Sequence, residues 1–381
     1  MSNAILLAPG PVQLHPEVQK ILAQPMTHHR TPEFDKILKR VLTNLKNIFQ
    51  TENHVFVHTS TGSGGMESLL VNLLSPGDDV LAIVSGKFGE RWAEMAETYG
   101  AKVHRLNVEW GNAVEIKAVD AFLQSHPQTK LVLCQATETS TATAHEIEFL
   151  GKIIHRTPAL FLVDGITAVG AYDLKMDDWF IDGLVAGSQK AFMLPTGLSF
   201  VSLSKKAWTV AEKSTCPRYY FDLKRELIAN ERGETLFSTS VHLIKALDWV
   251  LMRILEIGLV RHFQQIRRRG EFTRAVAKVM KLELYSTKPS DSVTALKLPS
   301  YLDGVVLRNH IEKTYHLTIM GGQDLAKGKI IRIGHMGYIT EEHMIETMYR
   351  IALSMKDFHV DIDPELIKKY ATNWLKDYPN P

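Results

Sequence analysis

The sequence predicts an α/β protein, in which a large domain with a mainly parallel sheet precedes a smaller C-terminal α+β domain. Two observations support this prediction. Between about residues 55 and 205, short apolar runs alternate with helical patterns, as in sheets whose strands are connected by helices. The runs are also almost wholly apolar, which is typical of parallel strands that are buried on both faces.

The predicted strands and helices follow one another in this order. The buried strands are "VLAIV" (80–84), "LVLC" (131–134), "LFLV" (160–163) and "GLVAG" (183–187). A helix is predicted before the first of them, because apolar residues recur at the spacing i, i+3, i+4, i+7, i+8 at Met66, Leu69, Leu70, Leu73 and Leu74. A second helix is predicted in "GERWAEMAETYG", which has the same spacing.

The last third of the chain has a different pattern. A long helical pattern over roughly 238–258 closes the large domain. It is followed by the helical stretch "GLVRHFQQIRRRGEFTRAVAKVM" and by the short strand candidates "VTALKL" and "IIRIG". Helices and a few short strands in this order predict a smaller α+β domain.

Composition limits the classes of function. The chain has 381 residues and a formal net charge of +2, which gives no electrostatic case for nucleic acid or an anionic membrane. Its two cysteines, Cys134 and Cys216, lack disulfide-scaffold or metal-site spacing, so we expect no metal site. No apolar run approaches the roughly 20 residues of a membrane span, and we expect a cytoplasmic protein.

Unusual polar stretches directly follow five of the strand candidates. "HTSTGSGG" follows "HVFV", "SGKFG" follows "VLAIV" and "QATETSTA" follows "LVLC". Asp164 follows "LFLV", and Lys190 follows "GLVAG". Because ligands of α/β sheets bind at the carboxyl ends of parallel strands, we expect these residues to meet at one rim of the sheet.

Three features of this rim are ambiguous when each is taken alone. The glycine-rich stretch "STGSGGMES", just before a predicted helix, suits a phosphate but could also be an ordinary tight turn. Asp164 could cap a helix or form a salt bridge. Lys190 could extend to solvent.

Taken together, these features predict a site for pyridoxal 5′-phosphate. A desolvated lysine loses part of its preference for the ammonium form, so Lys190 could attack the aldehyde and hold the cofactor as a Schiff base. Asp164 would keep the pyridine nitrogen protonated, so that the ring accepts the electron pair released from the substrate Cα. The helix N-terminus would hold the phosphate.

The chain resembles the class V aminotransferases of pyridoxal-phosphate fold type I, near the alanine–glyoxylate and serine–pyruvate group. The resemblance covers almost the full length and rests on "LAPGPVQLHPEV", "TSTGSGGMES", "SGKFGERW", "ATETSTA", "VDGITAVG", "IIRIGHMG" and above all "GSQKAFMLPTG". It implies a seven-stranded sheet in the large domain. It also implies an N-terminal segment that reaches the active site (1–20), a large cofactor-binding domain (21–260) and a small domain (261–381).

The resemblance implies roles for residues around the cofactor ring. Lys190 matches the catalytic Schiff-base lysine, and Asp164 matches the catalytic partner of the pyridine nitrogen. Phe88 matches an aromatic residue that stacks on the ring, which is a favourable arrangement for two flat rings. Thr139 matches a hydroxyl near the phenolic oxygen of the cofactor.

Other matches concern the phosphate and the substrate. The matches to the phosphate site are Ser63, Gly64, Gly65 and Gln189. Arg332 matches the arginine that pairs with the substrate carboxylate, which a guanidinium fork suits. Gly10 matches a position where the N-terminal segment approaches the substrate.

Thr239, in "LFSTSVH", matches a phosphate contact that the neighbouring subunit donates. The resemblance therefore implies a homodimer with an active site completed by the second chain. Two positions depart from the family pattern. Ala142 replaces a glycine, and Leu236 stands where some relatives have a phosphate-binding tyrosine.

The expected reaction is ping-pong transamination of a small amino acid, alanine or serine, with glyoxylate or pyruvate as the acceptor. Alternatives within fold type I are transamination of 2-aminoethylphosphonate or a lyase reaction. A cysteine desulfurase is disfavoured, because neither Cys134 nor Cys216 is placed as a catalytic loop cysteine. The alternative from another class is a non-catalytic family member, which the presence of Lys190, Asp164 and Arg332 disfavours.

Overall fold

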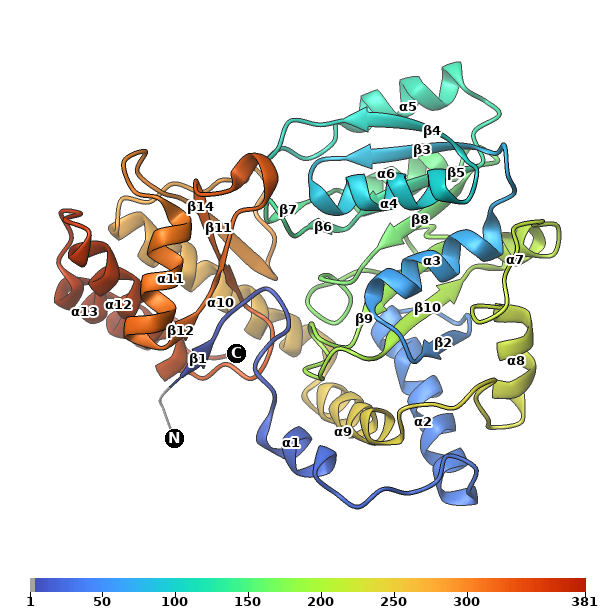
Figure 1. Ribbon diagram of the computed structural model, residues 1–381, viewed down its shortest axis with the longest axis horizontal. Coiled ribbons are helices and arrows are strands. Elements are labelled where there is room, and N and C mark those ends of the chain that lie inside the picture. Colours follow the sequence, from blue (N-terminus) through green and yellow to red (C-terminus); the bar gives the residue numbers. More distant parts are fainter. Residues whose placement is uncertain (1–3) are drawn as a thin grey trace.

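The computed structural model describes residues 4–381 (Figure 1). Residues 1–3, part of the N-terminal segment predicted as 1–20, lie outside the described residues. The helices are α1 (Pro16–Leu22), α2 (Pro32–Phe49), α3 (Gly62–Leu73), α4 (Lys87–Thr98), α5 (Ile116–Ser125), α6 (Ile147–Ile154), α7 (Lys205–Ala211), α8 (Leu223–Glu231), α9 (Val241–Ile257), α10 (Leu259–Val279), α11 (Gly304–Tyr315), α12 (Glu341–Asp357) and α13 (Pro364–Asp377).

The longer strands fall into two sheets. They are β2 (Val55–His58), β3 (Asp79–Val84), β4 (Lys102–Asn107), β5 (Leu131–Gln135), β8 (Leu160–Asp164), β9 (Gly183–Gly187), β10 (Ser199–Leu203), β11 (Val293–Lys297) and β14 (Ile330–Gly334). Five strands of two residues each complete the set: β1 (Ile5–Leu6), β6 (Thr137–Glu138), β7 (Thr143–Ala144), β12 (Leu317–Thr318) and β13 (Met320–Gly321).

The large sheet has seven strands in the order β2-β10-β9-β8-β5-β3-β4. Neighbours from β9 to β4 pair in parallel, and β10 runs antiparallel to both of its neighbours. The predicted seven-stranded, mainly parallel sheet is therefore confirmed. Strand β8 runs one residue further than predicted, because Asp164 pairs with Gln135 on one side and Val185 on the other.

Helices cover both faces of this sheet, as the apolar strands predicted. In β3, Val80 and Ala82 pack into a cluster with residues of α3 and α4. Leu81 and Ile83 point to the opposite face and pack into a cluster that includes residues of α2, α6 and α9. This alternation follows from the two-residue period of a strand and explains why almost every position in the central strands is apolar.

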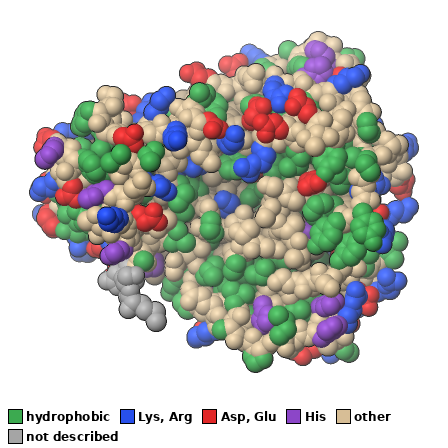
Figure 2. Space-filling model, viewed as in Figure 1, with side chains coloured by type: hydrophobic (Ala, Val, Ile, Leu, Met, Phe, Trp, Pro, Cys, Tyr) green, Lys and Arg blue, Asp and Glu red, His purple; other side chains and the backbone are tan. Residues whose placement is uncertain are grey.

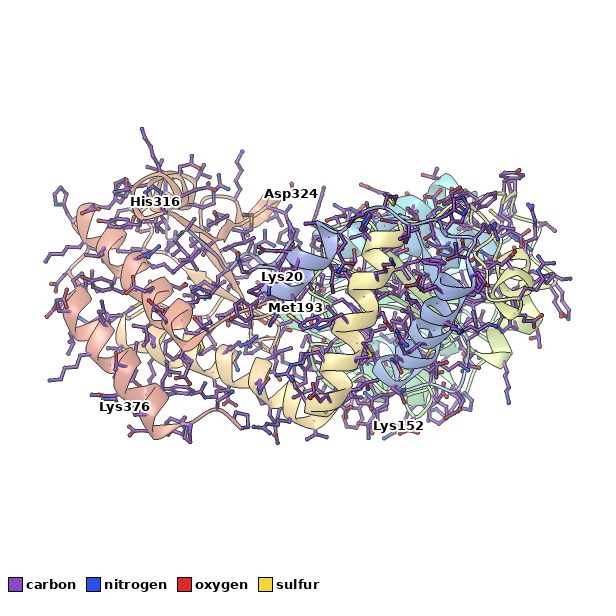
Figure 3. All side chains as sticks on the ribbon, turned by 90° about the horizontal axis from the view of Figure 1, so that it is seen from below. Lys20, Lys152, Met193, His316, Asp324 and Lys376 are labelled. Carbon is purple, nitrogen blue, oxygen red and sulfur yellow. The ribbon has the colours of Figure 1, made fainter. Side chains whose placement is uncertain are left out.

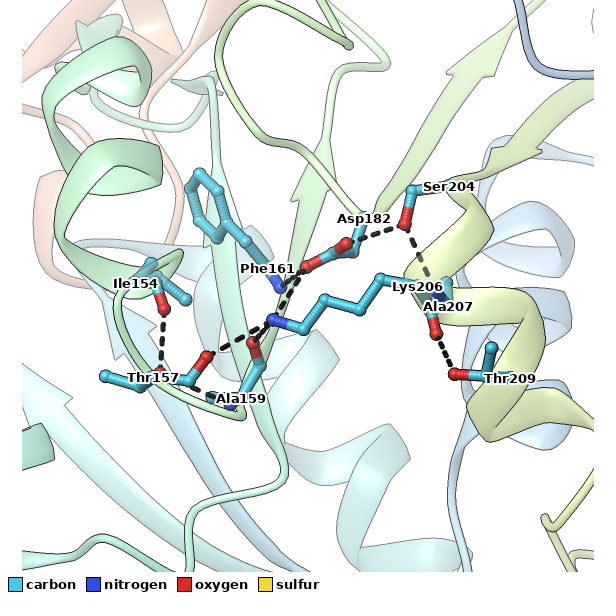
Figure 4. A network of polar contacts seen from close by, with 9 residues as sticks. All are labelled: Ile154, Thr157, Ala159, Phe161, Asp182, Ser204, Lys206, Ala207 and Thr209. Carbon is cyan, nitrogen blue, oxygen red and sulfur yellow. Dashed lines mark hydrogen bonds and ion pairs between the residues drawn. The ribbon is translucent and has the colours of Figure 1, made fainter.

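The amino ends of the central strands are held by a polar network (Figure 4). The carboxylate of Asp182, just before β9, accepts hydrogen bonds from the backbone N–H of Phe161 (3.0 Å) and the hydroxyl of Ser204 (2.6 Å). Lys206 donates to the carbonyl oxygen of Ala159 (2.5 Å). These contacts tie β8 and β9 to α7 at the edge of the sheet opposite to the predicted site.

The C-terminal part packs around its own apolar cluster, which is built from α10 to α13, β14 and the N-terminal strand. The sheet β11-β14-β13 is antiparallel, and β1 pairs in parallel with β12. The N-terminal strand is thus part of the small body of the molecule (Figure 1). The long helix α10 leads from one body into the other, and the domain limits 21–260 and 261–381 stay a prediction.

Within residues 4–381, none of the helices has the length and apolar character needed to cross a bilayer.

Candidate active site

Residues from several strand ends share one cavity of about 100 Å³. Its lining is Thr61, Gly62, Ser63, Met66, Phe88, Arg91, Thr139, Asp164, Ile166, Thr167, Gln189 and Lys190. Figure 2 shows a hollow between the two bodies of the molecule, with Lys or Arg side chains inside it. The sequence predicted six of these lining residues as members of one site. Arg91 and Thr167 were missed, although both stand in the quoted stretches "SGKFGERW" and "VDGITAVG".

Asp164 lies at the carboxyl end of β8 and is 6% exposed. Its carboxylate accepts a hydrogen bond from the backbone N–H of Ile166 (2.9 Å). Burial raises the pKa of Asp164 to about 7, and the nearby Glu138 adds to the rise. A buried carboxyl with few partners is costly, so the site favours a cationic group beside Asp164.

Lys190 lies in the turn after β9 and points into the same cavity. Its Nζ donates a hydrogen bond to the carbonyl oxygen of Pro9 (2.9 Å). Burial lowers the pKa of Lys190 to about 8, and the charge of Arg332 lowers it further. At neutral pH a larger fraction of this amine is unprotonated than of a surface lysine, which suits a nucleophile.

The N-terminal segment reaches Lys190 from the small body of the molecule. The N–H of Gly334 donates to the carbonyl oxygen of Leu7 (2.7 Å), so β14 holds the segment just before it enters the site. At Gly10 the backbone has φ 139°, and an added Cβ would lie 2.3 Å from Nζ of Lys190. A side chain at this position would have to displace the Lys190 amine, and the positive φ also favours glycine.

A Gly10→Ala variant is expected to incorporate cofactor much more weakly than the wild type, because its methyl group would displace the Lys190 amine. Absorption spectra after incubation with pyridoxal phosphate measure this. Gly77→Ala is the matched control, since Gly77 also has a positive φ (91°) but nothing within 4 Å of an added Cβ. Equal incorporation by the two variants would contradict the prediction.

The N-terminus of α3 borders the cavity. Its N-cap residue Thr61 makes no side-chain capping bond, so the first N–H groups of the helix are available to an anion. Ser63 lines the cavity. The side-chain Oε1 of Gln189 is buried and lacks a hydrogen-bond partner among the described residues. Unsatisfied donors and a reorientable amide at one end of the cavity fit a phosphate group.

Gly64 and Gly65 do not line the cavity, but both allow close packing around it. An added Cβ at Gly65 would lie 2.6 Å from the side chain of Val185 in β9. At Gly64 it would lie 2.9 Å from Ser60. The two glycines therefore let α3 approach the sheet, which places its N-terminus at the cavity.

Phe88 lies in the first turn of α4 and is held there by Glu138, a residue that the sequence patterns did not single out. The buried carboxylate of Glu138 accepts hydrogen bonds from the N–H groups of Phe88 (3.1 Å) and Gly89 (3.0 Å). It also accepts from the hydroxyl of Ser140 (2.5 Å). A carboxylate at a helix N-terminus is stabilising, and here it fixes the backbone that carries the Phe88 ring.

Thr139 and Arg332 connect the cavity to the small body. The hydroxyl of Thr139 is 2.7 Å from that of Thr167, and its carbonyl oxygen accepts from Nη1 of Arg332 (2.9 Å). Nε of Arg332 donates to the carbonyl oxygen of Gly321 (2.9 Å). Burial lowers the pKa of Arg332 to about 10, so the guanidinium stays a cation at neutral pH. Arg332 itself does not line the cavity.

Thr239 lies in a neighbouring crevice rather than in the Lys190 cavity. Its hydroxyl is 3.1 Å from that of Thr59. Nearby, the ring of Phe237 stacks on Tyr220 at a centroid distance of 5.1 Å. The backbone N–H of Leu236 donates to Glu226 (3.1 Å). Thr239 therefore does not line the Lys190 cavity of its own chain.

Ala142, which replaces a family glycine, adopts a left-handed backbone with φ 59°. This conformation costs an alanine roughly 1–2 kcal/mol. The methyl group is fully buried and packs against Val293 and Ala295, which offsets part of that cost.

Comparison with known proteins identifies a family that matches the chain. The family described as aminotransferase class-V matches residues 13–216, slightly more than half of the chain. An L-aspartate–glyoxylate aminotransferase of Paracoccus denitrificans is 33% identical over 94% of this chain and 92% of its own. A serine–glyoxylate aminotransferase of Methylorubrum extorquens is 30% identical over 98% of this chain and 96% of its own.

A solved structure is also similar over the full length. The ureidoglycine–glyoxylate aminotransferase of Bacillus subtilis superposes with a TM-score of 0.94, is 27% identical and covers 99% of both chains.

Proposed function

The chain belongs to the class V aminotransferase family, and we propose that it transfers the amino group of a small amino acid to glyoxylate with pyridoxal 5′-phosphate held in the Lys190 cavity. The observation that carries the proposal is that Lys190 and Asp164 line one cavity, with the open N-terminus of α3 at its edge. The bound cofactor would supply the electron sink for chemistry at the substrate Cα.

The residues present fit the cofactor. The N-terminus of α3, Ser63 and Gln189 would hold the phosphate, and Phe88 would cover one face of the ring. Asp164 would pair with the protonated pyridine nitrogen, which satisfies a carboxyl that is otherwise buried with few partners. Because the Lys190 amine is bonded to the Pro9 carbonyl, we expect the Lys190 side chain to leave Pro9 when its amine attaches the cofactor.

Lys190 would act twice. Its amine would hold the cofactor by the aldehyde group, with loss of water. It would also accept the proton that leaves the substrate Cα and hold it for return later in the reaction. A pKa lowered to about 8 suits both tasks, because an amine near neutral pKa can take up and release a proton.

Arg332 would bind the α-carboxylate of the donor and the carboxylate of the acceptor. Its Nε and Nη1 are held by two carbonyl oxygens, so the guanidinium is fixed in place before a substrate arrives. Fixed donors lose little entropy when they bind a carboxylate.

Arg332→Gln is expected to lower kcat/KM about 10- to 100-fold for every donor that carries an α-carboxylate, because one charge-assisted pair is lost. The visible absorption of the bound cofactor should stay unchanged. Steady-state kinetics with added glyoxylate measure the first effect, and spectra measure the second. A KM that does not change would contradict the assignment of Arg332.

Alanine or serine is the proposed donor, and glyoxylate is the proposed acceptor. Support for glyoxylate comes from the two curated relatives and the solved structure, all of which are named as glyoxylate aminotransferases. Support for serine comes from the name of one of these relatives. Coupled assays that offer alanine, serine and aspartate separately with glyoxylate test the donor.

Aspartate is a second candidate donor, which two observations favour. A relative with 33% identity is named for aspartate and glyoxylate. In addition, Arg91 lines the cavity and makes no hydrogen bond or ion pair within residues 4–381; its guanidinium lies 4.9 Å from the centroid of the Phe88 ring. A second cation at the cavity could receive the side-chain carboxylate of aspartate.

A homodimer is proposed as the working form, in the cytoplasm. Large exposed apolar side chains gather near Thr239, namely Tyr219 (70% exposed), Tyr220 (42%) and Ile228 (49%). Figure 2 shows hydrophobic side chains over α8 and the chain beside it. A second copy covering this surface would bring its Thr239 to the first active site. Sedimentation of the purified protein tests the dimer.

A further inference from the structure

A second cavity lies behind the Lys190 turn, where the two bodies of the molecule meet. Its volume is about 520 Å³, within the usual range for small-molecule pockets. We call it the junction pocket; its lining includes His15, Met193, Arg253, Arg261, Gln265 and Arg269. Figure 3 labels Met193 at the meeting of the two bodies, beside α9.

The junction pocket carries excess positive charge. Three arginines line it, and Glu256 is the one acidic side chain among the lining residues. Glu256 is already paired with Arg253 (2.8 Å), and both side chains are largely exposed. Neither Arg261 nor Arg269 has a carboxylate side chain beside it within the pocket. Among the described residues, Arg261 is held at Nε alone, which donates to the oxygen of Pro381 (2.7 Å), so its two Nη groups are available to an anion.

Arg269 is the deepest of these cations. Its Nη1 donates to the carbonyl oxygens of His335 (3.1 Å) and Gly337 (3.3 Å), and it has no ion pair within the described residues. Burial, aided by the neighbouring charge of Arg268, lowers the pKa of Arg269 to about 10. Arg269 is half-buried, and a partly desolvated cation held only by carbonyl dipoles favours an anion beside it.

Neutral groups in the junction pocket could complete a ligand site. His15 accepts a hydrogen bond from the N–H of Glu17 at Nδ1 (3.1 Å), so its Nε2 carries the proton and is a donor. The side-chain amide of Gln265 makes no hydrogen bond with another described residue, and Gln265 lines the cavity. Apolar walls are supplied by Met193, Ile266 and Ile339, among others.

The pocket is separate from the candidate active site. Lys190 lines the active-site cavity, whereas Ala191 and Met193 line the junction pocket. The N–H of Met193 donates to the carbonyl oxygen of Lys190 (3.0 Å), so one turn of chain separates the two.

We propose that the junction pocket is a binding site for a small dianion, a phosphate or a dicarboxylate, held between Arg261 and Arg269. Arg261 is exposed at the rim and can draw the anion in, while Arg269 at the floor provides a charge that lacks a counter-ion. Because residues of both bodies line the pocket, the occupant would contact both sides of their junction. The proposal does not depend on which amino acid the active site uses.

The test is calorimetric titration of the cofactor-saturated protein with inorganic phosphate and, separately, with succinate. Saturable binding of one equivalent per chain is expected for at least one of the two probes. Arg261→Gln and Arg269→Gln should each weaken it about 10-fold or more, since each removes a charge-assisted contact. The Arg261 variant keeps the test valid if the Arg269 variant does not fold.

Two control variants distinguish binding in the junction pocket from binding at the protein surface or in the active site. Arg267→Gln, also on α10, removes an exposed arginine that pairs with Asp291 (3.0 Å) and does not line the pocket, so it should bind the probe as the wild type does. Arg332→Gln should also keep the junction-pocket equivalent, because it alters the active site only. An additional equivalent of succinate that is lost in Arg332→Gln would belong to the active site. Absence of saturable binding of both probes would overturn the proposal. So would wild-type affinity in both pocket variants, or an equal loss in Arg267→Gln or Arg332→Gln.

Discussion

Lys190→Ala is expected to lower the turnover number at least about 10,000-fold, which corresponds to about 5.5 kcal/mol in activation free energy. The loss is large because one amine both attaches the cofactor and moves the Cα proton. The alanine variant should also lack the visible absorption of a lysine-bound pyridoxal, even with excess cofactor. Steady-state rates and spectra of the same preparation measure both effects.

Lys205→Ala is the control for this variant. Lys205 is exposed at the start of α7, far from the strand ends that form the site, so its loss should leave rate and spectrum unchanged. Folding of Lys190→Ala is expected to be normal, since the change removes a buried amine whose charge is disfavoured by burial. A Lys190→Ala protein with full turnover would contradict the mechanism.

Asp164→Asn is expected to have opposite effects on activity and stability. Activity of the cofactor-bound enzyme should fall at least about 100-fold, or about 3 kcal/mol, because the pyridine nitrogen loses its anionic partner. The cofactor-free chain should become more stable at pH 8, because asparagine removes a buried carboxylate that must ionise there.

The sign of this effect on the free energy of unfolding follows from the ionisation of Asp164. Burial raises the folded-state pKa of Asp164 from 3.8 to about 7, so the folded chain binds this proton more tightly than the unfolded chain does. The resulting stabilisation is complete below pH 3.8 and is lost as the pH rises to about 7. Above pH 7 the free energy of unfolding of the asparagine variant should exceed that of the wild type by on the order of 2–4 kcal/mol. Urea unfolding of both cofactor-free proteins at pH 5 and pH 8 measures this difference.

Asp182→Asn is the matched control, since Asp182 is another buried aspartate next to a strand of the same sheet. At the edge of the sheet opposite to the site, the Asp182 carboxylate accepts two hydrogen bonds and pairs with Lys206 (Figure 4). Asp182→Asn should therefore lose stability but keep its activity per folded molecule. If Asp164→Asn behaved like Asp182→Asn, the role of Asp164 would be structural only.

Much of the fold was predictable because buried parallel strands are apolar on both faces. The runs at 80–84, 131–134, 160–163 and 183–187 all fall within strands of the large sheet, and the periodic stretch from Met66 falls in α3. Strand β4 was not predicted. All residues of this edge strand are partly or fully exposed, so it lacks an apolar run.

The strand ends also predicted which residues would meet. Asp164, Lys190, Phe88 and Thr139 line one cavity because four strands or turns end at the same edge of the sheet. The contact between Lys190 and the Pro9 carbonyl was not predictable, since it depends on the pairing of β1 with β12 far along the chain. The support that Glu138 gives to α4 was likewise hidden, because a carboxylate in "ATETSTA" gives no sign that it caps a helix about fifty residues earlier.

The junction pocket could not be foreseen either. Its arginines belong to α9 and α10 and form part of ordinary amphipathic patterns, which are typical of solvent-exposed helix surfaces. Only the packing of α10 against the Lys190 turn and the chain after β14 leaves Arg269 without a carboxylate partner.

The central claim is that Lys190 holds a cofactor that accepts an amino group from one donor and passes it to glyoxylate. The most direct measurement is the visible spectrum of the cofactor-loaded protein after single additions of alanine, serine or aspartate, followed by glyoxylate. We predict that the band of the lysine-bound cofactor bleaches with one of these donors and returns when glyoxylate is added. A protein that never develops the band, or a band that none of the donors bleaches, would contradict the claim.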